Sequence, residues 1–420
     1  MIDIQANGIN DSRVSIPGSK SYTHRALVAA ALSNGYCRIG NPLDSEDTRL
    51  TAEALRCLGV AIQPFESGLV VHGRGGRFAT WDPPVELNNS GTSMRLLTAL
   101  ASVGTGRYVL TGSDRMRQRP LGDLVNALIQ VGVDVESVHG NGCPPVAVMG
   151  GTLTGGQVWV DCHISSQYLS ALLFVAPLAP LGMDIRVRTD PVSTPYIDMT
   201  LAVMERFGIR VDRDGYRRFR IAGRQRYRAA DLAIEPDASN AGYFWAAAAI
   251  TGRTVKVAGL DTDSRQGDIG FVEVLARMGC TVTRDPDGIA VTGGKLTGLD
   301  VDMSRMPDLV PTLAVVAAFA RGRTTIRNVA HLKAKESDRL SAVTTELRKM
   351  GIEAESDDDS LTVVGGRAHG AVVDTYDDHR IAMSFAVAGI KVPGVKIRNE
   401  GCVTKSFPGF WKVFGGLYRK

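Results

Sequence analysis

Residues 121–148 read LGDLVNALIQVGVDVESVHGNGCPPVAV and hold the pattern that decides the fold. Apolar residues at helical spacing run from Leu121 to Gly132, and two β-like runs between Val133 and Val148 then flank a turn. The same succession of helix, glycine and hairpin recurs along the chain, and its helices end at Gly59, Gly132, Gly208, Gly279 and Gly351. These spacings of 71 to 76 residues imply about six units in 420 residues.

One unit is divided between the chain ends. Residues 407–416 read as a helix without a hairpin, and residues 2–16 read as a hairpin without a helix. Joined, the two segments complete a sixth unit, so we expect an α/β protein with two lobes of three units each. One lobe is expected to hold residues 1–18 and 235–420, the other residues 19–234, with the active site in the cleft between them.

Composition and charge exclude several classes of protein. With 44% hydrophobic and 22% charged residues, a chain of this length is typical of a globular protein with more than one domain. A formal charge of +4 is too small to indicate nucleic-acid binding. The first twenty residues lack a signal peptide, and the apolar stretches at 169–183 and 309–320 are too interrupted for a membrane span. We therefore expect a cytoplasmic protein that binds neither nucleic acid nor a membrane.

Neither the cysteines nor the histidines form a recognisable motif. The six cysteines include no C-x-x-C pair, and none of the seven histidines stands at zinc-motif spacing to another ligand. We expect reduced thiols, most of them buried, and no metal site.

The chain becomes basic and rich in small polar residues where the repeat is interrupted. These clusters lie at residues 17–25, 88–95, 114–120, 164–167, 306–308, 333–339, 377–380 and 404–406. Most precede a predicted helix, where helix capping alone would explain Ser, Thr, Asp and Asn. Capping does not require Lys or Arg, yet these cations recur beside the capping residues. Because a helix N-terminus favours negative charge, the clusters indicate anion-binding sites.

Cations outnumber carboxylates in these clusters. The cations are Lys20, Arg25, Arg119, Lys335, Arg339, Arg380 and Lys405, and the carboxylates are Asp308, Glu336 and Asp378. This excess suits small substrates that carry several phosphates and carboxylates. Carboxylates in such surroundings stay ionised and can serve as bases.

Nine short motifs occur in the order found in one enzyme family. They are PGSKSYTHRAL, NNSGTSMR, RQRP, SSQ, SxPYID (193–198), MPD, KESDRL, DDHRIAM and TKSFP. Between Pro17 and Phe407 the chain therefore resembles the 5-enolpyruvylshikimate-3-phosphate (EPSP) synthase family of enolpyruvyl transferases. The resemblance implies two lobes of three βαβαββ units each, an inside-out α/β barrel. It also implies a cytoplasmic monomer that joins shikimate 3-phosphate to phosphoenolpyruvate, in the pathway to aromatic amino acids, without a cofactor or metal.

The resemblance also assigns residues to the two substrates. Shikimate 3-phosphate is expected to contact Lys20, Ser21, Arg25, Ser165, Ser166, Gln167, Ser193, Tyr196, Asp308 and Lys335. Phosphoenolpyruvate is expected to contact Lys20, Asn89, Gly91, Arg119, Gln167, Glu336, Arg339, Arg380 and Lys405. The inhibitor glyphosate occupies this second subsite in the family, so a methyl group at Gly91 is expected to weaken glyphosate more than phosphoenolpyruvate.

The chemistry requires a base and an acid. We expect Asp308 to take the proton of the 5-hydroxyl, with Lys335 beside the same hydroxyl, and Glu336 or Lys20 to protonate the methylene carbon. Four positions differ from the family's commonest form, in which Ala, Ala and Pro stand at Ser90, Ser93 and Leu96, and Asn stands at His331 in many relatives.

Two alternatives have different sequence requirements. The sister transferase that acts on UDP-N-acetylglucosamine usually has a Cys in a loop that corresponds to residues 114–120, which contain none. The second alternative is either a non-catalytic anion-binding relative, which should have lost Asp308, Glu336 or Lys20, or a relative that acts on RNA ends. A relative that acts on RNA should show aromatic stacking residues and more basic charge, and this chain shows neither.

Overall fold

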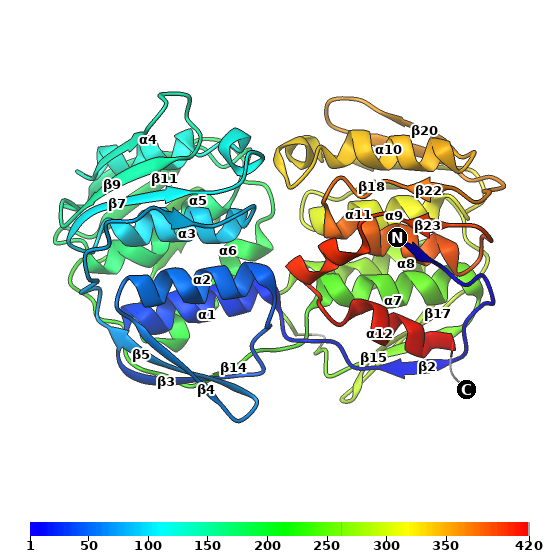
Figure 1. The fold of residues 1–420 in the computed structure, drawn as a ribbon, viewed down its shortest axis with the longest axis horizontal. Helices are drawn as coiled ribbons and strands as arrows, with labels where there is room; N and C mark the ends of the chain where they lie inside the picture. The colour runs from blue at the N-terminus through cyan, green and yellow to red at the C-terminus, as the bar shows by residue number, and fades with distance from the viewer. Residues whose placement is uncertain (262, 419–420) are drawn as a thin grey trace. The chain divides into compact units, whose positions relative to one another are not determined.

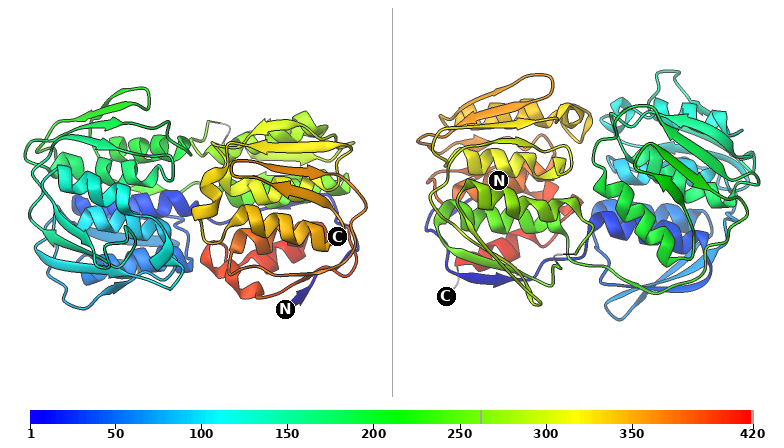
Figure 2. Two further views of the ribbon diagram at one scale, coloured as in Figure 1. Left: turned by 90° about the horizontal axis from the view of Figure 1, so that it is seen from above. Right: turned by 180° about the vertical axis from the view of Figure 1, so that it is seen from behind.

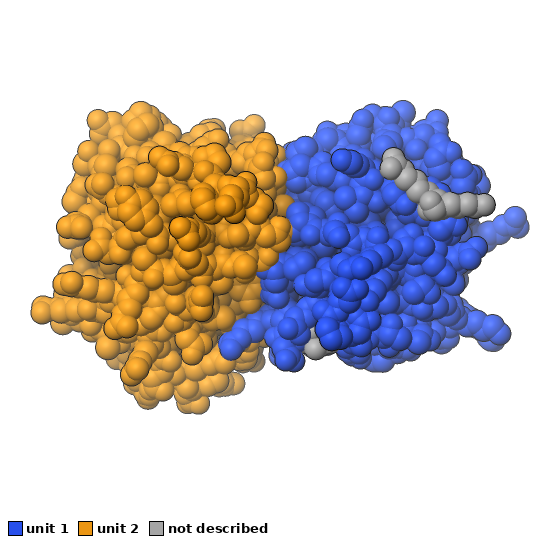
Figure 3. Space-filling view, turned by 90° about the horizontal axis from the view of Figure 1, so that it is seen from below, with its two compact units in different colours: residues 1–17, 235–420 blue, residues 18–234 orange. Residues whose placement is uncertain are grey.

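The computed structural model describes residues 1–261 and 263–418. The chain divides into two compact units: unit 1 contains Met1–Pro17 and Glu235–Lys420, and unit 2 contains Gly18–Ile234 (Figure 3). The helices of the described residues include none with both the length and the apolar character that a membrane crossing requires.

Unit 2 contains three four-stranded sheets with the strand orders β14-β3-β5-β4, β6-β7-β9-β8 and β10-β11-β13-β12. Its main helices are α1 (Lys20–Leu32), α2 (Glu46–Cys57), α3 (Gly91–Ala101), α4 (Gly122–Gln130), α5 (Gln167–Val175) and α6 (Pro195–Arg206). Its strands are β3 (Asn34–Gly40), β4 (Ala61–Phe65), β5 (Gly68–Arg74), β6 (Val85–Glu86), β7 (Gly106–Thr111), β8 (Asp134–Ser137), β9 (Val146–Gly150), β10 (Gly156–Val160), β11 (Met183–Val187), β12 (Asp212–Asp214), β13 (Arg218–Ile221) and β14 (Leu232–Ala233).

The described residues of unit 1 form sheets with the strand orders β16-β17-β15-β2, β18-β19-β21-β20 and β1-β23-β22. The helices are α7 (Ala238–Thr251), α8 (Phe271–Met278), α9 (Val310–Ala317), α10 (Arg339–Lys349), α11 (His379–Gly389) and α12 (Phe410–Gly415). The strands are β1 (Ile2–Asp3), β2 (Ser12–Val14), β15 (Thr254–Ala258), β16 (Thr281–Asp285), β17 (Gly288–Thr292), β18 (Asp300–Asp302), β19 (Arg323–Arg327), β20 (Glu353–Ser356), β21 (Leu361–Val364), β22 (Val372–Val373) and β23 (Lys396–Ile397).

The predicted repeat is confirmed by the way its helices end. The five glycines at positions 59, 132, 208, 279 and 351 all have a positive φ, between 79° and 114°. In each copy the residue after the glycine donates its backbone N–H to the carbonyl five residues earlier, as Val60 does to Leu55 at 3.0 Å. This is the Schellman motif, which favours glycine because a side chain is strained at positive φ.

Three helices in each unit are almost completely buried: α1, α3 and α5 in unit 2, and α7, α9 and α11 in unit 1. They are apolar or small-residue-rich around their whole circumference, as a buried helix must be. Figure 1 shows α7 and α9 side by side in unit 1, and Figure 2 shows the sheets at the periphery of each unit. The polar segments that start these helices are thereby brought together within each unit.

The N-terminal segment differs from the prediction. Residues 2–16 do not form a hairpin, because β1 pairs antiparallel with β23 while β2 pairs parallel with β15 in another sheet. The connection between them is part of the core of unit 1: Ile4 and Ile9 are buried, and Asn10 N–H donates to the backbone oxygen of Leu417 at 3.0 Å. These long-range contacts replace the tight turn that the sequence suggested.

The chain passes from one unit to the other between a strand and the helix that follows it. β2 precedes α1 of unit 2 but pairs with β15 of unit 1, and β14 precedes α7 of unit 1 but pairs with β3 of unit 2. Gly18 lies at the first crossing, where a Cβ atom would be 2.0 Å from the backbone oxygen of Asn41. A glycine is therefore required two residues before Lys20, the first residue of α1.

Candidate active site

Arg25 joins α1 to α6 in unit 2. Its guanidinium donates to the backbone oxygens of Ser21 and Tyr196 at 3.0 Å each. Its Nε donates to Thr200 Oγ1 at 2.8 Å. Burial lowers the pKa of Arg25 to about 10, so the group is still charged at neutral pH. The structure thus brings together Ser21, Arg25 and Tyr196, which the sequence assigned to shikimate 3-phosphate.

The start of α5 carries three further predicted residues and adjoins a fourth. Ser166 Oγ donates to the backbone oxygen of Ser193 at 3.3 Å, and Ser165 Oγ accepts from the backbone N–H of Gln167 at 3.2 Å. Ser193 has a φ of 56°, and its buried Oγ has no hydrogen-bond partner in the described part of the chain. An unsatisfied buried hydroxyl costs about 1–3 kcal/mol, so Ser193 is well suited to bind a ligand oxygen.

Asn89 and Arg119 meet at the start of α3. Arg119 Nη1 donates to both the backbone oxygen and Oδ1 of Asn89 at 3.0 Å. Arg95, which had no role in the sequence-based assignment, donates from Nη1 to the backbone oxygen of Gly91 at 3.1 Å and to Gln167 Oε1 at 3.3 Å. Apart from Lys20, the unit 2 residues assigned to phosphoenolpyruvate thus form one cluster. The guanidinium groups of Arg95 and Arg119 both lie close to Gly91 in this cluster.

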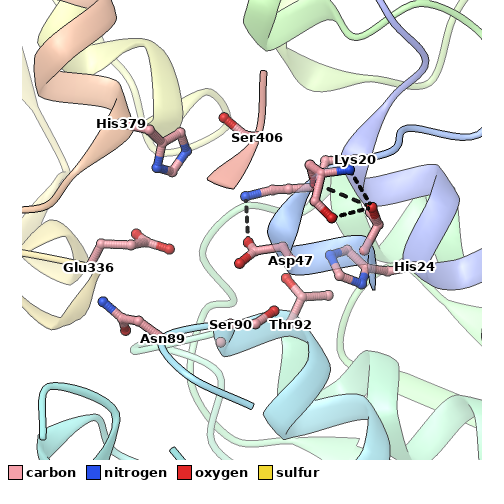
Figure 4. A network of polar contacts seen from close by, with 12 residues as sticks. Lys20, His24, Asp47, Asn89, Ser90, Thr92, Glu336, His379 and Ser406 are labelled. Carbon is pink, nitrogen blue, oxygen red and sulfur yellow. Dashed lines mark hydrogen bonds and ion pairs between the residues drawn. The ribbon is translucent and has the colours of Figure 1, made fainter. Parts of the chain in front are cut away.

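Lys20 begins α1 and is paired with a carboxylate that the sequence analysis did not single out. Its Nζ lies 3.1 Å from Asp47 Oδ2, and both side chains are buried (Figure 4). Asp47 lies in the first turn of α2, where an acidic residue also suits the helix dipole. This ion pair fixes the direction of the Lys20 side chain.

The surroundings of Gly91 change the expectation for Gly91→Ala: at the phosphoenolpyruvate subsite expected from the sequence, the Michaelis constant for phosphoenolpyruvate and the inhibition constant of glyphosate should rise together, each by about tenfold or more. A Cβ atom at position 91 would lie 2.5 Å from Arg119 Nη2 and 2.5 Å from Arg95 Nη1, so both buried guanidinium groups must move. Steady-state kinetics with and without glyphosate measure both constants. If the glyphosate constant alone rises, the methyl group discriminates by ligand length, as the sequence analysis expected, and the arginines adapt.

Three carboxylates surround one buried guanidinium in unit 1. Arg339, the first residue of α10, donates from Nη1 to Asp308 Oδ1, from Nη2 to Glu336 Oε2 and from Nε to Asp378 Oδ2, each at 2.8 Å. Its side chain is only 2% exposed. Burial alone would lower the pKa of Arg339, but the charges of Asp378, Glu336 and Asp308 outweigh it and raise this pKa well above its ordinary value.

Asp308 is held by two arginines. It lies in the 3₁₀ helix η4 (Pro307–Leu309) directly before α9, and its second oxygen, Oδ2, accepts from Arg380 Nη2 at 3.0 Å. Arg380 also donates from Nη1 to the hydroxyl of Tyr243 at 3.0 Å, and its backbone N–H donates to Asp378. Each oxygen of the Asp308 carboxylate thus accepts a hydrogen bond from a different guanidinium group.

The remaining predicted residues of unit 1 lie on two other 3₁₀ helices. Lys335 follows η5 (Ala330–Ala334), and buried Lys405 ends η6 (Glu400–Lys405), which packs against α11. Burial and the charge of Lys335 lower the pKa of His331 to about 3, so His331 is neutral at physiological pH. The buried Nε2 of His331 has no hydrogen-bond partner within the described residues, so this ring can take the polar role of the more common Asn.

Asp268 is a buried carboxyl that sequence reasoning missed. It lies in η3 (Gly267–Gly270) and accepts a hydrogen bond from Ser239 Oγ at the start of α7. Its Oδ1 is buried without a partner in the described residues. Burial, with a further contribution from the charge of Asp308, raises the pKa of the Asp268 carboxyl to about 7.

Asp268→Asn is expected to make stability less dependent on pH. The folded protein holds the Asp268 proton up to about pH 7, whereas an unfolded Asp loses it near pH 4, so the wild-type stability falls as pH rises through this window. The variant should match the wild type near pH 4 and exceed it above pH 7, by on the order of 4 kcal/mol. Urea unfolding across this pH range measures the difference. Parallel stability curves would show that the Asp268 carboxyl does not titrate in this window.

The residues that sequence reasoning missed have partners far away in the chain. Asp47 pairs with Lys20 across 27 positions, and Ser239 reaches Asp268 across 29. Only Arg95 had a local signal, since it stands four residues after Gly91 and ends the motif NNSGTSMR. Spacing along a helix could have identified Arg95, but no local pattern identifies Asp47 or Asp268.

Each unit, taken by itself, offers a distinct chemistry. Unit 2 holds buried cations and hydroxyls at helix N-termini, which can bind phosphates and carboxylates. Unit 1 holds carboxylates that are hydrogen-bonded to arginine, and a carboxylate can act as a base. Within the described residues, no group of three or more His, Cys, Asp or Glu side chains is arranged to hold a metal ion.

Comparison with known proteins gives a consistent result. The model of the EPSP synthase (3-phosphoshikimate 1-carboxyvinyltransferase) family matches residues 5–414. The 3-phosphoshikimate 1-carboxyvinyltransferase of Methanoculleus marisnigri is 44% identical over 418 residues, which cover 99% of each chain. The enzyme of the same name from Syntrophobacter fumaroxidans is 46% identical over 411 residues, which cover 97% of each chain.

Solved structures agree. EPSP synthase from Acinetobacter baumannii superposes with a TM-score of 0.82 at 27% identity and covers 99% of this chain and 97% of its own. The enolpyruvyl transferase NikO from Streptomyces tendae shares the fold, with a TM-score of 0.80 at 21% identity and coverage of 99% and 96%. The fold class and the family resemblance predicted from the sequence are confirmed, and the sister transferase is disfavoured. The chain belongs to the EPSP synthase (3-phosphoshikimate 1-carboxyvinyltransferase) family.

Proposed function

We propose that this chain transfers the enolpyruvyl group of phosphoenolpyruvate to the 5-hydroxyl of shikimate 3-phosphate and releases phosphate. The observation that carries the proposal is the position of Asp308, whose carboxylate lies between the buried guanidinium groups of Arg339 and Arg380. A base beside two cations is what an alcohol needs to attack an anionic substrate. Family membership supports the same reaction.

Unit 2 supplies most of the groups for shikimate 3-phosphate in this proposal. Its phosphate and carboxylate are bound by Lys20, Ser21, Arg25, Ser165, Ser166, Gln167, Ser193 and Tyr196, together with Asp308 and Lys335 of unit 1. The orphaned hydroxyl of Ser193 and the charged guanidinium of Arg25 support this assignment.

Phosphoenolpyruvate uses cations of both units. The proposed contacts are Lys20, Asn89, Gly91, Arg119, Gln167, Glu336, Arg339, Arg380 and Lys405. The bonds that join Arg119 to Asn89 and Arg95 to Gly91 support a single subsite at the start of α3. Because α3 begins at Gly91, its N-terminal N–H groups add to the attraction for an anion.

The reaction proceeds in two steps. The 5-hydroxyl gives its proton to Asp308 while its oxygen attacks carbon 2 of phosphoenolpyruvate, and Glu336 or Lys20 adds a proton to the methylene carbon. In the second step the new methyl group returns a proton, the bond between carbon 2 and the phosphate oxygen breaks, and phosphate leaves. Lys335 stabilises the oxygen as it loses its proton. The arginines stabilise the negative charge throughout.

Release of inorganic phosphate tests the proposed function. We expect release from phosphoenolpyruvate only when shikimate 3-phosphate is present, with one phosphate for each enolpyruvyl product. Release without shikimate 3-phosphate, or release that requires UDP-N-acetylglucosamine, would assign the chain to a different reaction.

The proposal includes a monomeric enzyme in the cytoplasm: the composition favours the cytoplasm, and a monomer is the expectation from the sequence. Sedimentation at micromolar concentration and fractionation of cells that express the protein test these two points. A stable dimer, or activity confined to another fraction, would contradict them.

A further inference from the structure

Four buried side chains of unit 2 form one continuous hydrogen-bonded path. Ser90 Oγ lies 2.6 Å from Ser93 Oγ, and Ser93 Oγ lies 2.7 Å from Thr51 Oγ1. Thr51 Oγ1 in turn lies 2.7 Å from Nδ1 of His24. All four residues are 0% exposed. We call them the hydroxyl network.

The hydroxyl network connects three helices that carry the proposed site. His24 lies in α1, Thr51 in α2, and Ser90 and Ser93 at the start of α3. Ser93 Oγ also lies 3.4 Å from the backbone oxygen of Asp47, whose carboxylate holds Lys20. Figure 4 shows side chains of all three helices gathered beside Lys20.

Helix capping does not explain the two serines. Ser90 is the N-cap residue of α3, yet its side chain makes no capping bond to the backbone and instead contacts the side chain of Ser93. A buried hydroxyl lowers the stability of the fold unless it is hydrogen-bonded. Each member of the network provides a hydrogen-bond partner for the next, so the members stabilise one another.

We propose that the hydroxyl network positions the phosphoenolpyruvate subsite by fixing the first turn of α3, with Asn89 and Gly91, against the helices that carry Lys20 and Asp47. The inference rests on the proposed function and assigns Ser90, Ser93, Thr51 and His24 as positioning residues. Each hydroxyl has one proton to donate, so removal of one member leaves its neighbours without their partner.

A pair of substitutions at Thr51 separates positioning from packing. Thr51→Val keeps the shape and removes the hydroxyl, whereas Thr51→Ser keeps the hydroxyl and removes a methyl group. We expect Thr51→Val to raise both the Michaelis constant and the dissociation constant for phosphoenolpyruvate by about tenfold. The turnover number and the Michaelis constant for shikimate 3-phosphate should change by less than about twofold. Thr51→Ser should restore the wild-type constants.

Two further variants complete the experiment. Ser93→Ala should reproduce the effect of Thr51→Val, and the double variant should be no worse than either, because both interrupt the same path. Thr98→Val is the matched control, since Thr98 is a buried threonine of α3 that donates to its own helix at Met94 and lies outside the network. It should leave the constants for phosphoenolpyruvate unchanged.

Two results would show that these residues act by packing and not by positioning. Thr51→Ser would bind phosphoenolpyruvate as weakly as Thr51→Val, or Thr98→Val would show the same loss of affinity. Should Thr51→Val fail to fold, Ser93→Ala decides the question, since it removes the hydroxyl without adding any atom to the buried site. Calorimetry of phosphoenolpyruvate binding does not depend on turnover. It therefore tests the network even if phosphate release shows that the proposed reaction is wrong.

Discussion

Asp308→Asn is expected to lower the turnover number by about a hundredfold or more, since a positioned base typically contributes that much. The amide keeps the shape of the carboxylate but cannot accept the proton of the 5-hydroxyl. Arg339 and Arg380 now each donate to one Asp308 oxygen, at 2.8 Å and 3.0 Å. Loss of the negative charge leaves both guanidinium groups less neutralised, so the affinity for phosphoenolpyruvate should be unchanged or higher.

Rapid-quench kinetics and calorimetry test the two parts of this prediction separately. The first measures formation of product within one turnover, and the second measures binding of phosphoenolpyruvate to the variant. Asp300→Asn is a suitable control, because Asp300 is also paired with an arginine, Arg327, but both side chains are exposed. Turnover near the wild-type value would exclude Asp308 as the base.

The repeat was predictable because its signal is local. A helix that ends in a Schellman motif favours glycine at the position with positive φ. In the copies at Gly59 and Gly132 this glycine lies within a few residues of the helix end, so a short stretch of sequence contains the whole signal. Pairing between distant strands has no such signal. The sequence therefore suggested a hairpin for residues 2–16, although β1 pairs with β23, nearly 400 positions away.

The same distinction applies to the candidate site. Most of the predicted residues follow turns or start helices, where small polar residues and cations stand out in the sequence, as at Lys20 and Gln167. The hydrogen-bond partners that fix these side chains lie tens of positions away in the chain, some in the same repeat, as Asp47 does for Lys20, and some in another, as Arg95 does for Gln167. Asp378 lies 39 positions from Arg339, and no periodicity in the sequence relates them. The sequence thus indicates which groups take part, and the fold determines which of them meet.

Arg339→Met is expected to destabilise the protein by about 3–5 kcal/mol, the usual cost of leaving a buried charge without its partner. Arg339 contacts three carboxylates at once, and the most deeply buried of them, Asp378, is 0% exposed. Methionine keeps an unbranched apolar stem and has no charge, so Asp308, Glu336 and Asp378 would lose the guanidinium that they share. Urea unfolding at pH 7 measures the loss.

An exposed arginine provides the control for this variant. Arg327→Met also removes the partner of a carboxylate, Asp300, but at the surface, where an ion pair contributes about 0–1 kcal/mol. A large loss of stability in Arg339→Met and a small loss in Arg327→Met would show that the effect depends on burial of the ion pair. Equal losses at both positions would show that the carboxylates around Arg339 are not dependent on it.

A second substitution separates the two roles of Arg339. Asp378→Asn in the Arg339→Met background removes the most buried of the three negative charges, so the double variant should regain a large part of the lost stability. Its activity should stay low, because neither change returns a guanidinium to Asp308 and the phosphoenolpyruvate subsite. If stability and activity return together, Arg339 acts only by neutralising Asp378, and its proposed contact with phosphoenolpyruvate is wrong.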